Sequence, residues 1–158
     1  MPRRIGRSHI DPSIMAIFCT TRKRACRVIV DSSALIAILR GEPESEAFAQ
    51  ALDTAPRCLM SAANFLETAI VADGGRRAIP GRRLDELISE LEIVIEPVSE
   101  EQAHVARQAY RDYGRGSGHP AQLNFGDCFA YALARVTGEP LLFKGDDFRH
   151  TDIAPAVI

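Results

Sequence analysis

The chain has 158 residues, a length that suits one globular domain. Apolar residues make up 46% and charged residues 25%, which excludes disordered, collagen-like and coiled-coil proteins. No apolar run approaches the roughly 20 residues that span a bilayer, and the four cysteines form no CxxC pair, which excludes a zinc knuckle and a disulfide scaffold. We therefore expect a cytoplasmic protein with reduced thiols and no membrane contact.

Charge is distributed unevenly along the chain. Residues 1–27 carry seven basic side chains and one acid, a net charge of +6, whereas residues 28–158 carry 12 basic and 20 acidic side chains, a net charge of −8. We interpret residues 1–27 as a basic, disordered extension, either an artefact of an early start codon or an arm that steers RNA. A body of charge −8 repels a polyanion, so the domain either avoids nucleic acid or uses its acids to hold metal ions.

Short apolar strands alternate with helices from residue 28 onward. We expect strands at 28–30, 57–60, 93–95 and 141–143, with a short last strand at 153–158. We expect helices at 34–40, 44–52, 62–73, 84–91, 100–113 and 125–136. In the last helix, Phe125, Phe129 and Val136 are expected to face the core rather than to form a base-stacking platform. This alternation predicts an α/β fold in which helices cover both faces of a parallel sheet.

Acidic residues stand where the predicted strands end. Asp31 follows the first strand, Asp146 and Asp147 follow the fourth, Asp127 lies in the first turn of a helix, and Glu67 lies inside an apolar helix. Ligands of such folds gather at the carboxyl ends of the strands. Carboxylates that meet there without matching cations repel one another, and oxygen ligands of this kind suit Mg²⁺ or Mn²⁺.

Each acid also has a purely structural interpretation. Asp127 fits a capping box with Asn124, a role that is compatible with metal binding. Asp31 and the pair at 146–147 are residue types that turns favour. Glu67 can be a solvated helix residue, although its apolar neighbours favour a function.

Other kinds of active site fit the sequence less well. Asp31 is not followed by the second Asp of an aspartyl phosphatase, and the glycine-rich stretch 114–118 lacks the GK[ST] of a phosphate-binding loop. Cys128 is expected to be a small buried side chain rather than a nucleophile. The histidines have no metal-ligand spacing; they are His9, His104, His119 and His150.

Four segments resemble, in order and spacing, the motifs of PIN-domain nucleases, specifically the VapC-type toxins of bacterial toxin–antitoxin systems. They are VIVDSSALIA (28–37), SAANFLETA (61–69), LNFGDCFAYA (123–132) and PLLFKGDDF (140–148). The resemblance implies that residues 28–158 form a PIN domain, a three-layer α/β/α sandwich with a central parallel sheet of four to five strands. Residues 1–27 lie outside the resemblance.

The resemblance also implies an activity, the cleavage of transfer or ribosomal RNA by hydrolysis that depends on Mg²⁺ or Mn²⁺. Asp31, Glu67 and Asp127 match three acids of the family, with Asp31 and Asp127 as direct metal ligands. Many PIN domains carry TxDxDF in the last motif, where this chain has a glycine at the first Asp and Asp147 at the second. We expect Asp146 to serve as the fourth catalytic and metal-binding acid from a shifted position, with Asp147 as the alternative.

Partners follow from the same resemblance. A VapB-type antitoxin would insert a basic side chain into the acidic pocket, promoter DNA would be contacted only through the antitoxin, and the chain would form a homodimer. Arginines near the middle of the chain are candidates for holding the RNA backbone or for maintaining solubility; they are Arg76, Arg77, Arg82 and Arg83. The alternative function is a catalytically silent PIN-like scaffold that acts through antitoxin binding and transcriptional repression.

Overall fold

A computed structural model describes residues 27–74 and 81–158 of the chain. The predicted extension, apart from Arg27, lies outside these described residues, and so do Arg76 and Arg77. No helix in the two described ranges is both long enough and apolar enough to cross a bilayer.

Four parallel strands form the central sheet, which confirms the predicted α/β class. The strands are β1 (Arg27–Val30), β2 (Arg57–Ser61), β3 (Val94–Glu96) and β4 (Leu141–Leu142). Their order across the sheet is β3-β2-β1-β4, and all three neighbouring pairs are parallel. The direction of winding reverses between β1 and β4, and parallel sheets bind ligands beyond the strand ends at such a point.

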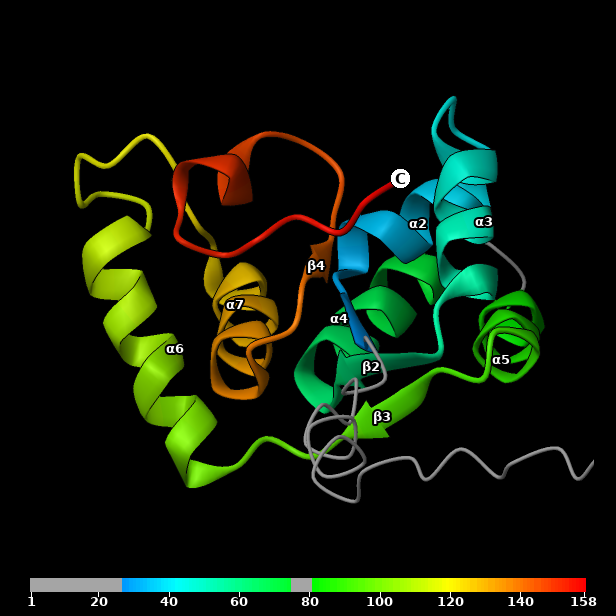
Figure 1. The fold of residues 1–158 in the computed structure, drawn as a ribbon, viewed down its shortest axis with the longest axis horizontal. Helices are drawn as coiled ribbons and strands as arrows, with labels where there is room; N and C mark the ends of the chain where they lie inside the picture. The colour runs from blue at the N-terminus through cyan, green and yellow to red at the C-terminus, as the bar shows by residue number, and fades with distance from the viewer. Residues whose placement is uncertain (1–26, 75–80) are drawn as a thin grey trace, which may run out of the picture.

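Helices cover both faces of the sheet and complete the three predicted layers (Figure 1). They are α2 (Ser32–Arg40), α3 (Ser45–Thr54), α4 (Ala62–Asp73), α5 (Gly81–Glu90), α6 (Glu100–Tyr113) and α7 (Phe125–Thr137), followed by the 3₁₀ turn η1 (Asp147–His150). In Figure 1, α6 and α7 lie on one side of the sheet, whereas α2, α3 and α5 lie on the other.

Alternate residues of each strand supply the two halves of the core. Ile29 and Leu59 pack with α6 and α7, whereas Val30 and Met60 pack with the helices of the opposite layer. All four side chains are buried. Because both faces of the sheet are covered, its strands are apolar throughout rather than alternating with polar residues.

Polar caps fix where the helices beside the sheet begin. Asp31 caps α2, Ser61 caps α4 and Asn124 caps α7, and in each case a side-chain oxygen accepts a backbone N–H of the first turn. Gly41 ends α2 in the left-handed conformation, with φ of 62°, where a side chain would be strained. These local signals explain why the predicted helix bounds agree closely with the observed ones.

The predicted last strand at 153–158 is wrong, because only one bridge, between Leu141 and Pro155, forms there. The Leu141 N–H donates to the Ala154 carbonyl at 3.0 Å, and the Ala156 N–H donates to the Leu141 carbonyl at 2.8 Å. Both bonds are made by Leu141 alone, so they close one bridge and no ladder. The sheet therefore has four strands, the lower end of the predicted range.

The predicted core position of Phe125 is also wrong, since this side chain is 77% exposed. Phe125, Phe129 and Val136 share one face of α7 at helical spacing, but Phe129 is half-buried and Val136 is also exposed in part. The buried residues of α7 include three alanines, Ala130, Ala132 and Ala134. Small side chains let the helix approach its neighbours closely, so the face with the largest apolar residues turns outward.

Candidate active site

Asp31 lies directly after β1, at the point where the winding of the sheet reverses, and its side chain is almost fully buried. Its Oδ2 accepts hydrogen bonds from the Ser33 backbone N–H at 3.0 Å and from the Ser33 hydroxyl at 2.5 Å. The Ser33 hydroxyl in turn accepts the Lys144 backbone N–H at 2.9 Å. The second oxygen, Oδ1, is buried without a hydrogen-bond partner. Hydrogen bonds therefore hold Oδ2 in place, whereas Oδ1 accepts none.

Glu67 extends from α4 toward the beginning of α7. Its Oε2 accepts a hydrogen bond from the Ser32 hydroxyl at 2.6 Å. A Cβ atom added at Gly126 would overlap the Glu67 carboxylate, so only glycine at that position leaves room for the acid. The absence of a side chain on the first turn of α7 thus lets Glu67 lie beside Asp127.

Asn64 connects the three helices that carry the acids. This fully buried side chain donates from Nδ2 to the Gly126 carbonyl at 3.0 Å and to the Ser32 hydroxyl at 3.3 Å. The sequence interpretation missed Asn64 and Gly126 as parts of the site. Two signals were available, a polar side chain in an apolar helix and a glycine inside a helix, where it costs up to about 1 kcal/mol relative to alanine.

Asp127 forms the predicted capping box at the start of α7. Its Oδ2 accepts the Asn124 backbone N–H at 2.7 Å, and its own backbone N–H donates to Asn124 Oδ1 at 3.0 Å. The box holds the carboxylate at the end of the helix and leaves its other oxygen outside these two bonds. A structural role and a chemical role are compatible at this residue.

The acids perturb one another electrostatically. Burial raises the pKa of Asp127 to about 6; the Asn124 N–H opposes this increase, and the negative charges of Asp31, Asp147 and Glu67 add to it. The pKa of Asp31 is also raised, first by burial and then by the charge of Glu67, against the hydrogen bonds from its serine neighbours. Both shifts come first from burial, and the negative charges of neighbouring acids add to them.

The two candidates for the fourth acid occupy different surroundings. The Asp146 side chain is 84% exposed and pairs with Arg149 at 3.4 Å. Asp147 begins η1, and its charge contributes to the raised pKa of Asp127, whereas Asp146 makes no such contribution. The structure thus brings Asp147 close enough to Asp127 for their charges to interact, and leaves the expected Asp146 at an exposed ion pair.

Lys144, which follows β4, does not neutralise these acids. Its ammonium group pairs with Glu42 at 2.6 Å and with Glu44 at 3.0 Å. These contacts fix the loop after β4 to the connection between α2 and α3. The ammonium charge is therefore directed to two other carboxylates.

The donor set suits a hard divalent cation, although the acids are not gathered around one point. In the parts of the chain that the structure describes, no three His, Cys, Asp or Glu side chains stand close enough to hold a metal ion. Asp31 nevertheless presents a buried oxygen without a donor, and Asp127 lies near enough to feel its charge. Oxygen ligands with excess negative charge are those that Mg²⁺ and Mn²⁺ prefer.

Cys128 has the structural role that the sequence predicts. It is buried in α7, and burial, followed by the charge of Asp127, raises the pKa of its thiol to about 11. A thiol of this kind is protonated at neutral pH and is a poor nucleophile. Of the four histidines, His9 lies outside the described residues, and His104 pairs with Glu100 on the surface of α6.

Comparisons with known proteins show the family of the chain. The sequence matches the PIN domain family over residues 28–154. It is 57% identical over 130 residues to ribonuclease VapC28 of Mycobacterium tuberculosis, which covers 82% of this chain and 98% of that protein. It is 46% identical over 131 residues to ribonuclease VapC30 of the same bacterium, with 83% and 99% covered.

Solved structures show the same fold at low sequence identity. VapC20 of M. tuberculosis, described as a sarcin–ricin loop cleaving toxin, has a TM-score of 0.61 at 19% identity, covering 80% of this chain and 96% of that one. A toxin–antitoxin complex from Klebsiella pneumoniae has a TM-score of 0.59 at 19% identity, covering 77% and 89%. From its sequence match and its close relatives, the chain belongs to the PIN-domain family and, within it, to the VapC ribonucleases.

Proposed function

We propose that this protein is a metal-dependent endoribonuclease toxin that hydrolyses phosphodiester bonds of RNA, and that a VapB-type antitoxin neutralises it. The names of its relatives support the reaction class, and the PIN fold supports the position of the site. Mg²⁺ is the proposed cofactor, with Mn²⁺ as the alternative.

The observation that carries this proposal is the free oxygen of Asp31. A buried carboxylate oxygen without a hydrogen-bond donor lowers the stability of the fold, because folding removes its hydrogen bonds to water and supplies none in return. The same side chain is held by Ser33 on its other oxygen, so its orientation is fixed in advance. A fixed, unpartnered anion near other carboxylates is what a cation site requires, and a structural turn has no need of it.

The four acids then divide between two roles. Asp31 and Asp127 are the proposed direct ligands, while Glu67 and Asp147 hold the ion through water or hold a second ion. When bound, a divalent cation would lower the pKa of a water molecule and neutralise charge on the scissile phosphate. Asn64 and Ser32 position Glu67, and the capping box positions Asp127. We place Asp147 in the fourth position, instead of Asp146.

The proposed substrate is transfer or ribosomal RNA. The sarcin–ricin loop is one target to test, because the structurally similar VapC20 is described as cleaving it. The proposed antitoxin reaches the acids with an Arg or Lys side chain, which would compensate the charge that raises the pKa of Asp127. A homodimer, and contact with promoter DNA through the antitoxin alone, belong to the same proposal.

The test is cleavage of total tRNA and rRNA by the purified full chain. We expect discrete fragments with Mg²⁺, none with EDTA, and none from the Asp127→Asn variant. Asp53→Asn removes an exposed carboxylate on α3 and is the matched control, which should cleave like the wild-type chain. Intact RNA in every lane would favour the silent scaffold. Cleavage that survives both EDTA and Asp127→Asn would come from a contaminating nuclease and would contradict the proposal.

A further inference from the structure

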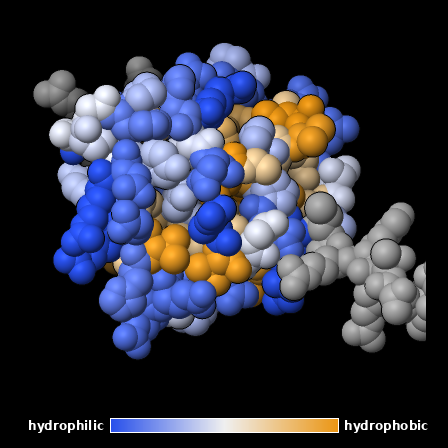
Figure 2. Space-filling model, turned by 60° about the vertical axis from the view of Figure 1, so that its left-hand side comes forward, coloured by the Kyte–Doolittle hydropathy of each residue, from blue (hydrophilic) through white to orange (hydrophobic). Residues whose placement is uncertain are grey.

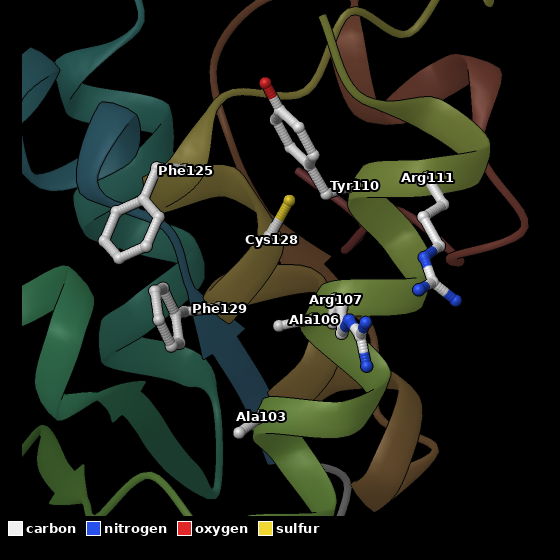
Figure 3. Close-up of a pocket in the computed structure, with 8 residues that line it drawn as sticks. All are labelled: Ala103, Ala106, Arg107, Tyr110, Arg111, Phe125, Cys128 and Phe129. Atoms are coloured by element: carbon white, nitrogen blue, oxygen red, sulfur yellow. The ribbon is translucent and has the colours of Figure 1, made fainter. Parts of the chain in front are cut away.

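A hollow of about 470 Å³ lies between α6 and α7, outside the group of acids. Figure 3 shows Phe125 and Phe129 on the α7 side of it and Tyr110, Arg107 and Arg111 on the α6 side. Ala103, Ala106 and Cys128 complete its lining. The proposed roles of the carboxylates use none of these residues.

Two aromatic side chains at the hollow are unusually open to solvent. Phe125 is 77% exposed and Tyr110 is 48% exposed. The rings of Phe125 and Phe129 form an edge-to-face pair with centroids 4.9 Å apart, so Phe125 packs against a neighbouring ring. Because exposing a large apolar ring to water is unfavourable, the pair indicates a surface that another molecule covers.

The basic side chains at the hollow differ in their ion pairing from Lys144 and Arg149. Arg107 and Arg111 stand one turn apart on the exposed face of α6. The ion pairs found within residues 27–74 and 81–158 include Lys144 and Arg149 but neither of these two arginines. Their charges are therefore available to an anion.

Phe125 links the hollow to the neighbourhood of the acids. Phe125 is followed directly by Gly126 and Asp127. A second hollow, of about 310 Å³, has Phe125 and Phe129 on one side and Glu67 on the other. Phe125 thus lines both hollows and is separated from the proposed metal ligand Asp127 only by Gly126.

We propose that the hollow between α6 and α7 binds an unpaired nucleotide next to the cleaved bond, with its base against Phe125 and Tyr110 and its phosphates near Arg107 and Arg111. This inference rests on the proposed ribonuclease function. Proteins that bind single-stranded RNA combine aromatic stacking surfaces with basic side chains in this way. The volume falls within the range of small-ligand pockets, which suits one nucleotide.

The charge at the edge of the hollow favours RNA as its occupant. On the side of the molecule that Figure 2 turns forward, apolar surface forms separate patches bordered by hydrophilic residues. A stable interface between proteins needs a broader apolar centre from which charged residues are depleted. The two arginines at the edge of the hollow instead complement phosphate groups.

Binding of a fluorescent single-stranded RNA 12-mer of mixed sequence tests the proposal. All variants are made in the full chain with Asp127→Asn, in Mg²⁺ buffer, so that binding is measured without cleavage. We expect Phe125→Ala and Tyr110→Ala each to weaken binding about tenfold, a typical loss for a base-stacking residue. Arg107→Gln with Arg111→Gln should lower the salt dependence of binding by about 1.4 in log–log slope, the value for two phosphate contacts.

Arg40→Gln with Arg57→Gln is the matched control, because it removes two exposed arginines, one from α2 and one from β2, that do not line the hollow. We expect this control to keep the affinity, the salt slope and the preference for single-stranded RNA over the matching duplex. The proposal is overturned if the Phe125, Tyr110 and arginine variants at the hollow bind as the parent does. It is also overturned if Phe125→Ala converts a dimer to a monomer in sedimentation while RNA affinity is unchanged.

Cleavage by the wild-type chain keeps the two proposals apart. If total RNA is cleaved and the hollow variants retain full affinity, the ribonuclease function stands and the nucleotide site fails. If the hollow variants lose affinity but the wild-type chain leaves all RNA intact, binding at the hollow stands and the ribonuclease function fails. Because Phe125 and Tyr110 are exposed, their alanine variants should keep the parent's melting temperature.

Discussion

Gly126 decides where Glu67 can lie, because any side chain at this position would occupy the space of the Glu67 carboxylate. The residue is buried in the first turn of α7, directly before Asp127. Alanine has a higher helix propensity than glycine, so helix α7 itself tolerates the change. An added side chain at Gly126 would therefore clash with Glu67 without disturbing the helix itself.

We expect Gly126→Ala to reduce RNA cleavage at least tenfold, since the added methyl group displaces Glu67. The rate of cleavage in saturating Mg²⁺ and the Mn²⁺ affinity both report the effect. Gly118→Ala is the control: its φ of 83° strains alanine, but open space surrounds the site. It should lower stability by about 1 kcal/mol and keep the activity. Equal activities of the two variants would contradict this role of Gly126.

The adjacent acids Asp146 and Asp147 offer a second comparison at the scale of single residues. We expect Asp147→Asn to reduce cleavage more than Asp146→Asn, because Asp147 contributes charge at Asp127 and Asp146 pairs with Arg149. Removing the Asp146 ion pair should cost under about 1 kcal/mol, since the pair is exposed. Cleavage rates of the two variants under identical Mg²⁺ decide the question, and a larger loss in Asp146→Asn would restore the expectation from the sequence.

At the scale of elements, three helices begin with the same kind of side-chain cap, but the loss of each cap has different consequences. Asn124 caps α7 and thereby supports Asp127, whereas Ser99 caps α6 by accepting the Gln102 N–H at 3.1 Å. Loss of either cap should destabilise the protein by about 1 kcal/mol. Asp31 differs from both, because the cap of α2 is itself one of the proposed metal ligands.

We therefore expect Asn124→Ala and Ser99→Ala to lower the free energy of unfolding by similar amounts, as measured by urea denaturation. Only Asn124→Ala should also reduce cleavage, because the first turn of α7 holds Asp127 in place. A matched loss of activity in Ser99→Ala would mean that general destabilisation, rather than the position of the carboxylate, explains the effect.

At the scale of the whole molecule, the acids destabilise the metal-free protein at neutral pH. The pKa of Asp127 is about 6 in the folded chain, against an ordinary value of 3.8. Between these pH values the folded state holds a proton that the unfolded state has lost. The contribution of Asp127 to stability is therefore highest below pH 3.8 and falls as the pH rises through about 6. The pKa of Asp31 is raised as well and acts in the same direction.

We expect the melting temperature of the wild-type chain in EDTA, relative to that of Asp127→Asn, to fall between pH 5 and pH 7.5. Asparagine does not titrate, so the difference isolates Asp127 from other groups. Mg²⁺ should raise the wild-type melting temperature more at pH 7.5 than at pH 5, because a protonated carboxyl binds metal poorly. A difference that stays constant with pH would contradict the raised pKa.

The sequence by itself determined the class of fold and indicated three acids as a candidate site. Apolar strands and capped helices are local features, so α4 and α6 begin and end where their caps and periodicity predict. Several motifs in a fixed order indicated Asp31, Glu67 and Asp127 together, where each acid alone also had a structural interpretation. The last strand was predicted wrongly, because the segment 153–158 forms a single bridge to Leu141 and no ladder.

Only the tertiary structure decided which groups meet. The free oxygen of Asp31, the glycine beneath Glu67 and the bond from Asn64 to the first turn of α7 each join segments more than 30 residues apart or depend on the burial they create. The outward turn of Phe125 depends on how closely an alanine-rich helix face approaches its neighbours. Contacts and burial of this kind arise only once the chain has folded, because local sequence patterns specify elements and not the distances between them.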